Sequence, residues 1–269
     1  MTKRGDIPVK ENIVPSYLPA VSVTMKPKAG GEPVTVFRPY EAYTVSALEP
    51  HAAQQECGAL LSLGERYFYG ILGAEQDYQK AYDYLKAAAE LGAQDAQALL
   101  ADYYLNDQIG LVETNPEKGE EMLILAAENG SWHAMEKLSK AYSSGIAGIR
   151  IDHEKAYAWA EQSERMTRIY WEFYAQPNFV DFTVTQKDIL HGNTRAALAL
   201  YYACMNGVGV KRDLNAAKKW LDRGEQFVCR ITGLAKVPVF QEKRAELKAR
   251  VQKDETRAEK KRRADEKKK

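Results

Sequence analysis

The sequence predicts an all-α fold, a right-handed α-solenoid built from about four helix-turn-helix repeats. Alanine and leucine recur at helical spacing, and the pattern returns from Ala59 to Ala96 and then to Ala134, shifts of 37 and 38 residues. Glycine-containing turns separate the helices, and an Asp or Asn precedes the second helix of each repeat, where an N-cap belongs. One helix pair cannot bury its apolar face alone, so the recurrence predicts stacked repeats that share a core.

The first repeat, residues 59–92, shows the pattern in full. In its first helix the small Gly64 follows a leucine, and Asp77 is placed to cap the second helix by accepting hydrogen bonds from free backbone donors. Gly92 follows the last apolar position, where a helix C-cap is expected. The second helix carries an apolar stripe at helical spacing, formed by Ala81, Leu85, Ala88 and Ala89.

Three further repeats have matching starts and N-caps, which are Ala96 with Asn115, Ala134 with Asp152, and Ala196 with Asp213. Pro116 directly follows its cap, and a proline is tolerated there because the first helical N–H has no partner in any case. The fourth repeat departs from the pattern, because Tyr201 stands at the small position and Cys204 at the position of a tyrosine.

The third repeat is extended by an insertion at about 166–191. Residues 153–176 contain no Gly or Pro and predict one long helix that ends at Pro177. Aromatic residues are concentrated in 157–182, and two interpretations remain open for them. They fill an enlarged core, which we favour, or they form a partner-binding ridge, since interface hot spots favour Trp and Tyr.

Two segments flank the solenoid, which we expect over 51–232. Residues 1–50 hold prolines at positions 8, 15, 19, 27, 33, 39 and 50, so we expect an extended arm there, with a hairpin as the alternative. Residues 233–269 predict a charged C-terminal helix that packs only near its start. From position 241 onward, 13 Lys/Arg face 7 Asp/Glu, a net charge of +6.

The composition is that of a globular protein, with 45% apolar and 28% charged residues and a net charge of +1. The three cysteines form no paired framework. The sequence contains no run of 18 apolar residues and no secretory leader pattern, so we expect no membrane span and a cytoplasmic location. That location changes to periplasmic or secreted if a leader precedes this sequence.

The repeated frame resembles the Sel1-like repeat family, relatives of the tetratricopeptide repeats. The frame runs Ala-x-x-x-Leu-Gly-x-x-Tyr-x-x-Gly, a Gly/Asp turn, and then Lys-Ala-x-x-x-Leu-x-x-Ala-Ala-Glu-x-Gly. Its signatures here are AAAELG at 87–92, LAAENG at 125–130 and GVGVKRD at 207–213. The resemblance implies an α-solenoid that mediates protein–protein contacts, often as an adaptor in bacterial signalling, secretion or host interaction. A narrower implied role is an immunity-type protein that neutralises one effector.

Catalytic and cofactor chemistry finds no support in the sequence. The four histidines are scattered and none lies in an HExxH pattern, so we expect no metal site and no cofactor. No Gly-x-Ser-x-Gly or Ser-x-x-Lys pattern supplies a nucleophile. GVGVKRD lies between two helices and lacks the third glycine of a nucleotide-binding loop. We therefore expect no enzyme and no catalytic residues.

We expect a protein-interaction module that binds a protein or peptide on the inner face of the first helix of each repeat. Two alternatives are an RNA- or polyanion-binding factor that uses the basic tail, and an enzyme with an unrecognised site. Nucleic acid is the less favoured ligand, because the tail lacks aromatic residues that stack on bases. The expected partner-binding residues are Glu65, Arg66, Tyr69, Asp102, Tyr103, Asn106, Lys140, Ser143 and Tyr202, together with Trp171, Phe173, Phe179 and Phe182 of the insertion.

Overall fold

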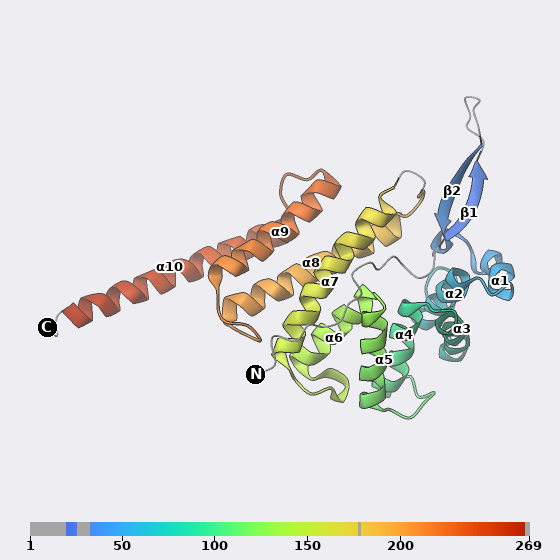
Figure 1. The fold of residues 1–269 in the computed structure, drawn as a ribbon, viewed down its shortest axis with the longest axis horizontal. Helices are drawn as coiled ribbons and strands as arrows, with labels where there is room; N and C mark the ends of the chain where they lie inside the picture. Colours follow the sequence, from blue (N-terminus) through green and yellow to red (C-terminus); the bar gives the residue numbers. More distant parts are fainter. Residues whose placement is uncertain (1–19, 26–32, 177–178, 267–269) are drawn as a thin grey trace.

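The computed structural model describes residues 20–25, 33–176 and 179–266, and helices dominate them (Figure 1). The elements follow in this order: β1 (Ala20–Met25), β2 (Val34–Pro39), the 3-10 helix η1 (Tyr40–Ala42), α1 (Val45–Ala53), α2 (Cys57–Tyr69), α3 (Tyr78–Glu90), α4 (Gln94–Leu105), α5 (Pro116–Glu128), α6 (Trp132–Ser144), the 3-10 helix η2 (Ile146–Gly148), α7 (His153–Tyr174), α8 (Thr183–Asn206), α9 (Leu214–Thr232) and α10 (Pro238–Glu266).

Four helix pairs confirm the predicted repeats: α2 with α3, α4 with α5, α6 with α7, and α8 with α9. The second helix of every pair begins at the expected N-cap, whose side-chain oxygen accepts a backbone N–H from the first turn. The four caps, with the donor distances, are Asp77 (3.0 Å), Asn115 (2.9 Å), Asp152 (3.0 Å) and Asp213 (3.0 Å). The all-α repeat solenoid is therefore confirmed.

The small residue at the Gly64 position is explained by helix packing. A Cβ atom at Gly64 would lie 2.7 Å from Cδ2 of Leu85, so α2 and α3 approach closely only because the side chain is absent. The fourth repeat packs differently. Its Tyr201 is fully buried, and the Tyr201 hydroxyl donates to the carbonyl oxygen of Lys243 in α10 at 3.2 Å. The departure from the repeat pattern therefore joins the solenoid to the C-terminal helix.

The N-terminal segment differs from the extended arm that we favoured. β1 and β2 form an antiparallel pair in which Val23 faces Val36, so the backbone donors that an extended arm leaves free are used in the sheet. Helix α1 begins at Val45, before the expected start of the solenoid at 51. The rest of the predicted arm, residues 1–19 and 26–32, lies outside the described residues.

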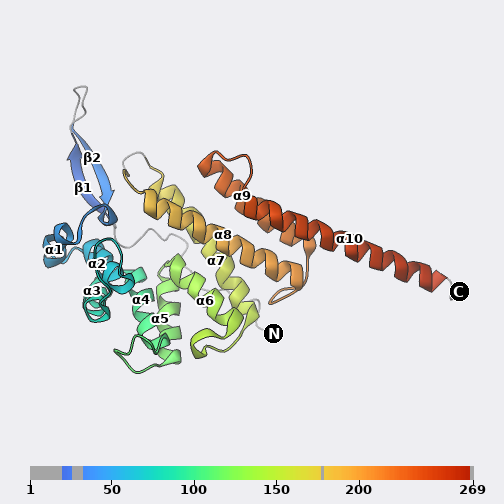
Figure 2. The ribbon, with the colours of Figure 1, turned by 180° about the vertical axis from the view of Figure 1, so that it is seen from behind.

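The insertion lengthens α7 and α8, which lie side by side in both ribbon views (Figures 1 and 2). Helix α7 ends at Tyr174, close to the predicted end of the long helix. The segment that joins α7 to α8 contacts the N-terminal hairpin, although the two lie far apart in the sequence. Phe37 stacks on Phe179 with ring centroids 5.3 Å apart, and Arg38 forms an ion pair with Asp181 at 2.6 Å.

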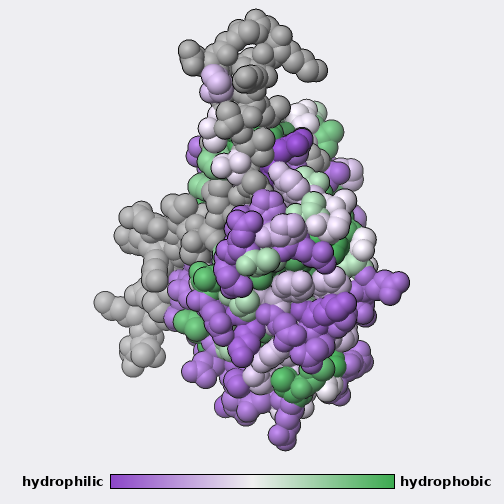
Figure 3. Space-filling model, turned by 90° about the vertical axis from the view of Figure 1, so that its right-hand side faces the viewer, coloured by the Kyte–Doolittle hydropathy of each residue, from purple (hydrophilic) through white to green (hydrophobic). Residues whose placement is uncertain are grey.

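The two ends of the described chain differ in character. Helix α10 buries Phe240 and Leu247 near its start and then extends away from the solenoid, and residues 255–266 are all exposed (Figures 1 and 2). Figure 3 looks at the opposite end, which is mostly hydrophilic with scattered apolar residues. Among the described residues, no helix combines the length and the apolar character that a membrane span requires.

Candidate functional site

The inner helices α2, α4, α6 and α8 line a surface with two neighbouring hollows. The acidic hollow, of about 470 Å³, lies between α2, α4 and α6 and is bordered by η1, the end of α7 and the start of α8. The alanine hollow, of about 410 Å³, lies between α6, α7 and α8. Both hollows are lined in part by residues of α6, so they adjoin along that helix.

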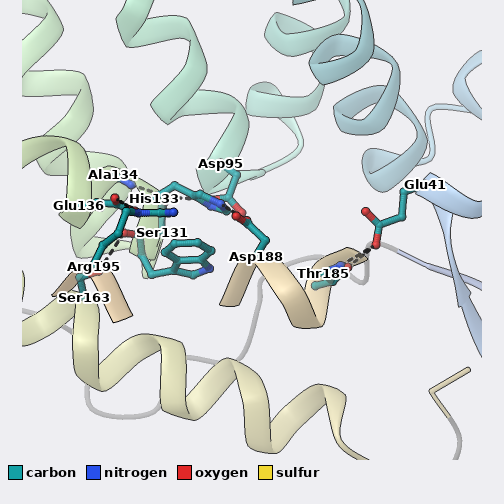
Figure 4. Close-up of polar contacts among 11 residues, drawn as sticks. Glu41, Asp95, Ser131, His133, Ala134, Glu136, Ser163, Thr185, Asp188 and Arg195 are labelled. Atoms are coloured by element: carbon teal, nitrogen blue, oxygen red, sulfur yellow. Dashed lines mark hydrogen bonds and ion pairs between the residues drawn. The ribbon is translucent and has the colours of Figure 1, made fainter. Parts of the chain in front are cut away.

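Two ion pairs connect α6 to α8 between the hollows, and we call them the α6–α8 bridge (Figure 4). His133 Nε2 lies 2.8 Å from Asp188 Oδ2, and Arg195 Nη2 donates to Glu136 Oε2 at 2.8 Å. His133 and Glu136 are one helical turn apart on α6, so they lie on the same face of that helix. The first pair lines the acidic hollow and the second lines the alanine hollow.

His133 is held by carboxylates on both sides. Besides Asp188, Asp95 from the first turn of α4 places Oδ1 3.4 Å from His133 Nδ1. Ser131, the N-cap of α6, donates to the same Asp95 oxygen at 2.5 Å and accepts the N–H of Ala134 at 3.1 Å. Burial opposes the charged imidazole, but the hydrogen bonds to Asp188 and Asp95 outweigh it and raise the pKa of His133 to about 10. The imidazole is therefore protonated at neutral pH.

A close helix approach positions this cluster. Trp132 is 2% exposed, and its ring stacks on His133 with centroids 3.6 Å apart. A Cβ atom at Gly192 of α8 would lie 2.3 Å from Cζ3 of Trp132. The glycine therefore lets α8 approach α6 closely, with Asp188 one helical turn before it.

Four further residues supply the remaining charges of the acidic hollow, and one of them, Lys137, pairs with Asp102, which lies outside the lining. Lys137 donates to Asp102 at 2.5 Å and to a backbone carbonyl, while the buried Arg66 donates to the carbonyl oxygens of residues 40 and 72. Glu41 accepts hydrogen bonds from the backbone N–H and the hydroxyl of Thr185, as Figure 4 shows. Glu65 of α2 also lines the hollow.

The carboxyl group of Glu65 has a strongly raised pKa. Burial of its carboxyl group, followed by repulsion from Asp95, Glu41 and Asp188, raises the pKa of Glu65 from 4.5 to about 8, and His133 opposes this only in part. Within the part of the chain that the structure describes, Glu65 forms no ion pair. A neutral carboxyl group at pH 7 is therefore available in this hollow.

The alanine hollow is mainly apolar, and its small side chains leave the space open. The Ser139 hydroxyl, at its edge, donates to the carbonyl oxygen of Ala156 at 2.9 Å. Lys140, Tyr202 and Val208 border it and are all exposed. The alanines that line it come from α7 and α8, and they are Ala156, Ala160, Ala196, Ala199 and Ala203.

The structure distributes the predicted inner-face residues over both hollows. Glu65, Arg66 and Tyr69 line the acidic hollow, and Lys140, Ser143 and Tyr202 line the alanine hollow. Asp102 is half-buried beside Lys137, and Asn106 is exposed at the C-cap of α4.

Arg66 and Tyr103 do not face outward as expected. Arg66 is 1% exposed because its guanidinium satisfies backbone carbonyls inside the solenoid. Tyr103 is fully buried because its ring packs against Phe68 and its hydroxyl donates to the carbonyl oxygen of Tyr78 at 2.8 Å.

The aromatic residues of the insertion lie in or against the core. Phe182 is 2% exposed and stacks on Tyr174 with centroids 5.1 Å apart, so it presents no ridge to solvent. Trp171, Phe173 and Phe179 are half-buried and pack against the same core. Phe173, Phe179 and Phe182 therefore cluster at the junction between the insertion and the N-terminal hairpin, whereas Trp171 packs against Phe227 of α9. A binding role for the exposed remainder stays a prediction.

Sequence reasoning missed the α6–α8 bridge. His133, Asp95, Asp188 and Arg195 come from three different helices, and no fixed sequence spacing links them. The one available signal was Gly192, which lies inside α8, because a helical glycine often marks a close packing contact.

Metal binding and thiol chemistry find little support among the described residues. The described residues contain no group of three or more His, Cys, Asp or Glu side chains placed to hold a metal ion. Cys57, Cys204 and Cys229 are free thiols. Burial raises the pKa of the Cys57 and Cys204 thiols above the ordinary range, which disfavours the reactive thiolate.

Comparison with known proteins adds family and fold information. A family model described as Sel1 repeat matches residues 58–92, 94–131, 132–166 and 195–224, just over half of the chain. The chain is also similar to a solved Sel1 repeat protein from Oxalobacter formigenes, with 20% identity and a TM-score of 0.50. That match covers 68% of this chain and 62% of the other, and it shows a shared fold.

Two curated relatives are fungal. The chain is 30% identical over 137 residues to chitin synthase regulatory factor 3 of Schizosaccharomyces pombe. It is 25% identical over 175 residues to chitin synthase regulator SKT5 of Malassezia restricta. These matches cover 50% and 65% of this chain but span only 14% and 10% of the two relatives. A bacterial origin, which the resemblance to bacterial adaptors suggested, stays a prediction.

Proposed function

Because the chain belongs to the Sel1 repeat family, we propose that it is a non-enzymatic protein–protein interaction module that binds a protein or peptide on its inner surface. The observation that carries the proposal is the pair of adjoining hollows lined by α2, α4, α6 and α8. Both are concave and combine apolar walls with a few polar groups, as binding sites generally do.

The role that best fits such a module is that of an adaptor or scaffold that holds a partner without changing it chemically. An immunity-type protein that neutralises one effector is a special case of the same binding. Both roles require a stoichiometric partner.

The test uses the full chain as bait in lysate of the native cells. Tyr69, 52% exposed in the acidic hollow, and Tyr202, 38% exposed in the alanine hollow, are each replaced by Ala. Leu125 is 50% exposed and lines neither hollow, so Leu125→Ala is the matched control. We expect a stoichiometric partner that both tyrosine variants lose and the control retains. Equal capture by all variants would place binding elsewhere and refute the proposal.

Polyanion binding through α10 has weaker support. Arg263 pairs with Glu259 at 2.6 Å and Arg262 pairs with Glu266 at 3.7 Å, so part of the basic charge is compensated within the helix. Retention on a heparin column that survives deletion of 241–269 would favour a specific polyanion site on the solenoid. Retention that disappears with the deletion would indicate nonspecific attraction to the tail.

A further inference from the structure

We propose that the exposed part of α10 carries a second binding surface, which takes an acidic segment of a partner protein, a run rich in Asp and Glu. The surface is a row of five cationic side chains that we call the basic stripe: Arg250, Lys253, Arg257, Lys260 and Lys261. None of these five residues lines either hollow, so the stripe lies beyond the inner surface of the proposed function and does not depend on it.

The stripe residues share one face of α10. They follow one another at intervals of three, four, three and one residues. With 3.6 residues per turn, this spacing places all five within about a third of the helix circumference. From Arg250 to Lys261 the stripe runs for roughly 16 Å along the helix axis. All five side chains are exposed, and α10 extends away from the solenoid here, so a partner can reach the whole face (Figures 1 and 2).

The stripe cations form no ion pair within the described residues, unlike other basic residues of the same helix. On the other faces of α10, Arg263 pairs with Glu259 and Arg262 pairs with Glu266. These pairs compensate charge away from the stripe. The positive charge of the helix is therefore concentrated on the stripe face.

The acids closest to the stripe along the helix do not cancel its charge. Those spaced three or four residues from a stripe cation are Glu246, Asp254 and Asp265. Asp254 pairs with Arg212 of the turn between α8 and α9. Lys243 is shared by Glu242 and Glu246, so one of these two carboxylates remains. When that carboxylate and Asp265 are both set against the five cations, the stripe keeps a net charge of +3.

Asp254 shows how the stripe acts on a carboxylate. The hydrogen bond from Arg212 is the main cause that lowers the pKa of Asp254, and the charges of Arg250 and Arg257 lower it further. The two stripe cations thus favour a charged carboxylate beside this face. A carboxylate that a partner brings to the stripe is stabilised in the same way.

The distribution of charge along the chain directs an acidic partner to α10. The whole chain has a net charge of +1 and residues 241–269 carry +6, which leaves −5 for residues 1–240. The rest of the protein therefore repels an acidic segment, whereas the C-terminal helix attracts it. An extended segment covers the roughly 16 Å of the stripe with about five residues.

The composition of α10 favours a protein partner over a nucleic acid or a membrane. Residues 252–266 contain no aromatic side chain and no aliphatic side chain larger than that of alanine. This part of the helix therefore offers nothing to stack on bases or to enter a bilayer. Glu255 and Glu259 lie on the face opposite the stripe, and they repel the phosphates of a duplex whose groove encloses a helix. An acidic protein segment contacts the stripe face alone.

The probe is a fluorescein-labelled peptide of twelve glutamates, with a twelve-residue Gly-Ser peptide as the neutral control. Binding to the full chain is measured by fluorescence anisotropy at about 0.05 M salt, because exposed charges are screened beyond roughly 10 Å at 0.1 M. We expect the glutamate peptide to bind and to lose affinity as salt is added, and the neutral peptide not to bind. Absence of binding by the glutamate peptide would overturn the inference.

Two triple variants with the same loss of charge separate the stripe from the tail as a whole. Lys253→Gln, Lys260→Gln and Lys261→Gln together remove three stripe cations. The matched control removes three cations from the other faces of α10, by Lys248→Gln, Arg262→Gln and Arg263→Gln. We expect the stripe variant to bind the peptide about tenfold more weakly, the combined effect of three exposed ion pairs, and the control to stay within about twofold of the wild type.

Equal weakening by the two triple variants would overturn the inference, because the net charge of the tail, and not the stripe, would then attract the peptide. Circular dichroism checks that both variants keep the helical content of the wild type. The single variants Lys260→Gln and Lys248→Gln repeat the comparison with the least change to the helix. Lys260→Gln should weaken binding about twofold and Lys248→Gln should leave it unchanged.

A 12-base-pair DNA duplex and vesicles that contain phosphatidylserine test the other polyanions. At equal salt, we expect both to bind the full chain more weakly than the glutamate peptide. If the duplex or the vesicles bind more tightly than the peptide and lose affinity in the stripe variant, the stripe recognises phosphates and the inference of an acidic protein segment fails.

The inner-surface variants separate the stripe from the proposed function. Tyr69→Ala and Tyr202→Ala should leave the affinity for the glutamate peptide unchanged, because neither residue lies on α10. If these variants weaken peptide binding and the stripe variant does not, the acidic segment binds the inner surface. The basic stripe is then refuted while the proposed function stands.

Discussion

Glu65 gives the sharpest stability prediction, because ionising its carboxyl group lowers the free energy of unfolding. Burial and repulsion from Asp95, Glu41 and Asp188 raise the pKa of Glu65 from 4.5 to about 8 in the folded protein. Because the pKa of Glu65 is higher in the folded than in the unfolded protein, its protonated form stabilises the fold, and this stability is fully present below pH 4.5. It is lost as the pH rises through about 8.

The magnitude follows from the same values. At 1.36 kcal/mol per pH unit, a pKa that moves from 4.5 to about 8 corresponds to at most about 5 kcal/mol. Glu65 is only half-buried, and solvent screening reduces this ceiling to about 1–2 kcal/mol. We therefore expect Glu65→Gln, which cannot ionise, to be more stable than the wild type by that amount at pH 9.

The assay is urea unfolding followed by circular dichroism at pH 5, 7 and 9. The advantage of Glu65→Gln over the wild type should grow with pH and level off above pH 8. Glu90→Gln removes an exposed carboxylate and should track the wild type at every pH. A difference between Glu65→Gln and the wild type that does not change with pH would refute the reasoning, because the carboxyl group would then titrate normally in the folded protein.

Three further predictions concern the α6–α8 bridge and α10. His133→Ala should lower the free energy of unfolding by about 1 kcal/mol near pH 7. Because the folded pKa of about 10 exceeds the ordinary 6.5, that loss should be full below pH 6.5 and vanish as the pH rises through 10 in a urea series. Gly192→Ala should cost about 1–3 kcal/mol by thermal melting, because its Cβ would meet Trp132, whereas Ala199→Gly in the same helix should cost no more than about 1 kcal/mol. Deleting 255–269 should leave the melting temperature unchanged, because residues 255–266 are exposed; a drop of several degrees would mean that they pack on the solenoid.

The repeats were predictable because they depend on local rules. N-caps such as Asp77 and Asp213, and the small Gly64, act within one helix pair, so they can be recognised from their spacing in the sequence. The start of α10 was predictable from its sparse apolar residues, of which Phe240 and Leu247 are buried.

The N-terminal hairpin was harder to predict because its stability is not local. An isolated two-stranded pair is marginal in water. Here Phe37 stacks on Phe179, and its carbonyl oxygen accepts the N–H of Val180 at 3.0 Å, so the insertion supports the hairpin. A proline-rich sequence gives no indication of a contact with residues about 140 positions away.

The sequence by itself determined the helix pairs, their caps and the long helix of the insertion, because these follow from helical periodicity and the spacing of cap residues. The same periodicity put Glu65 and Tyr69 on the inner face together with the buried Arg66 and Tyr103, because burial depends on the neighbouring helices. The tertiary structure alone decided that Asp95, His133 and Asp188 meet, and that the inner surface divides into an acidic and an alanine hollow. The physical reason is distance along the chain: these contacts join three helices, and their geometry is set by how the helices stack.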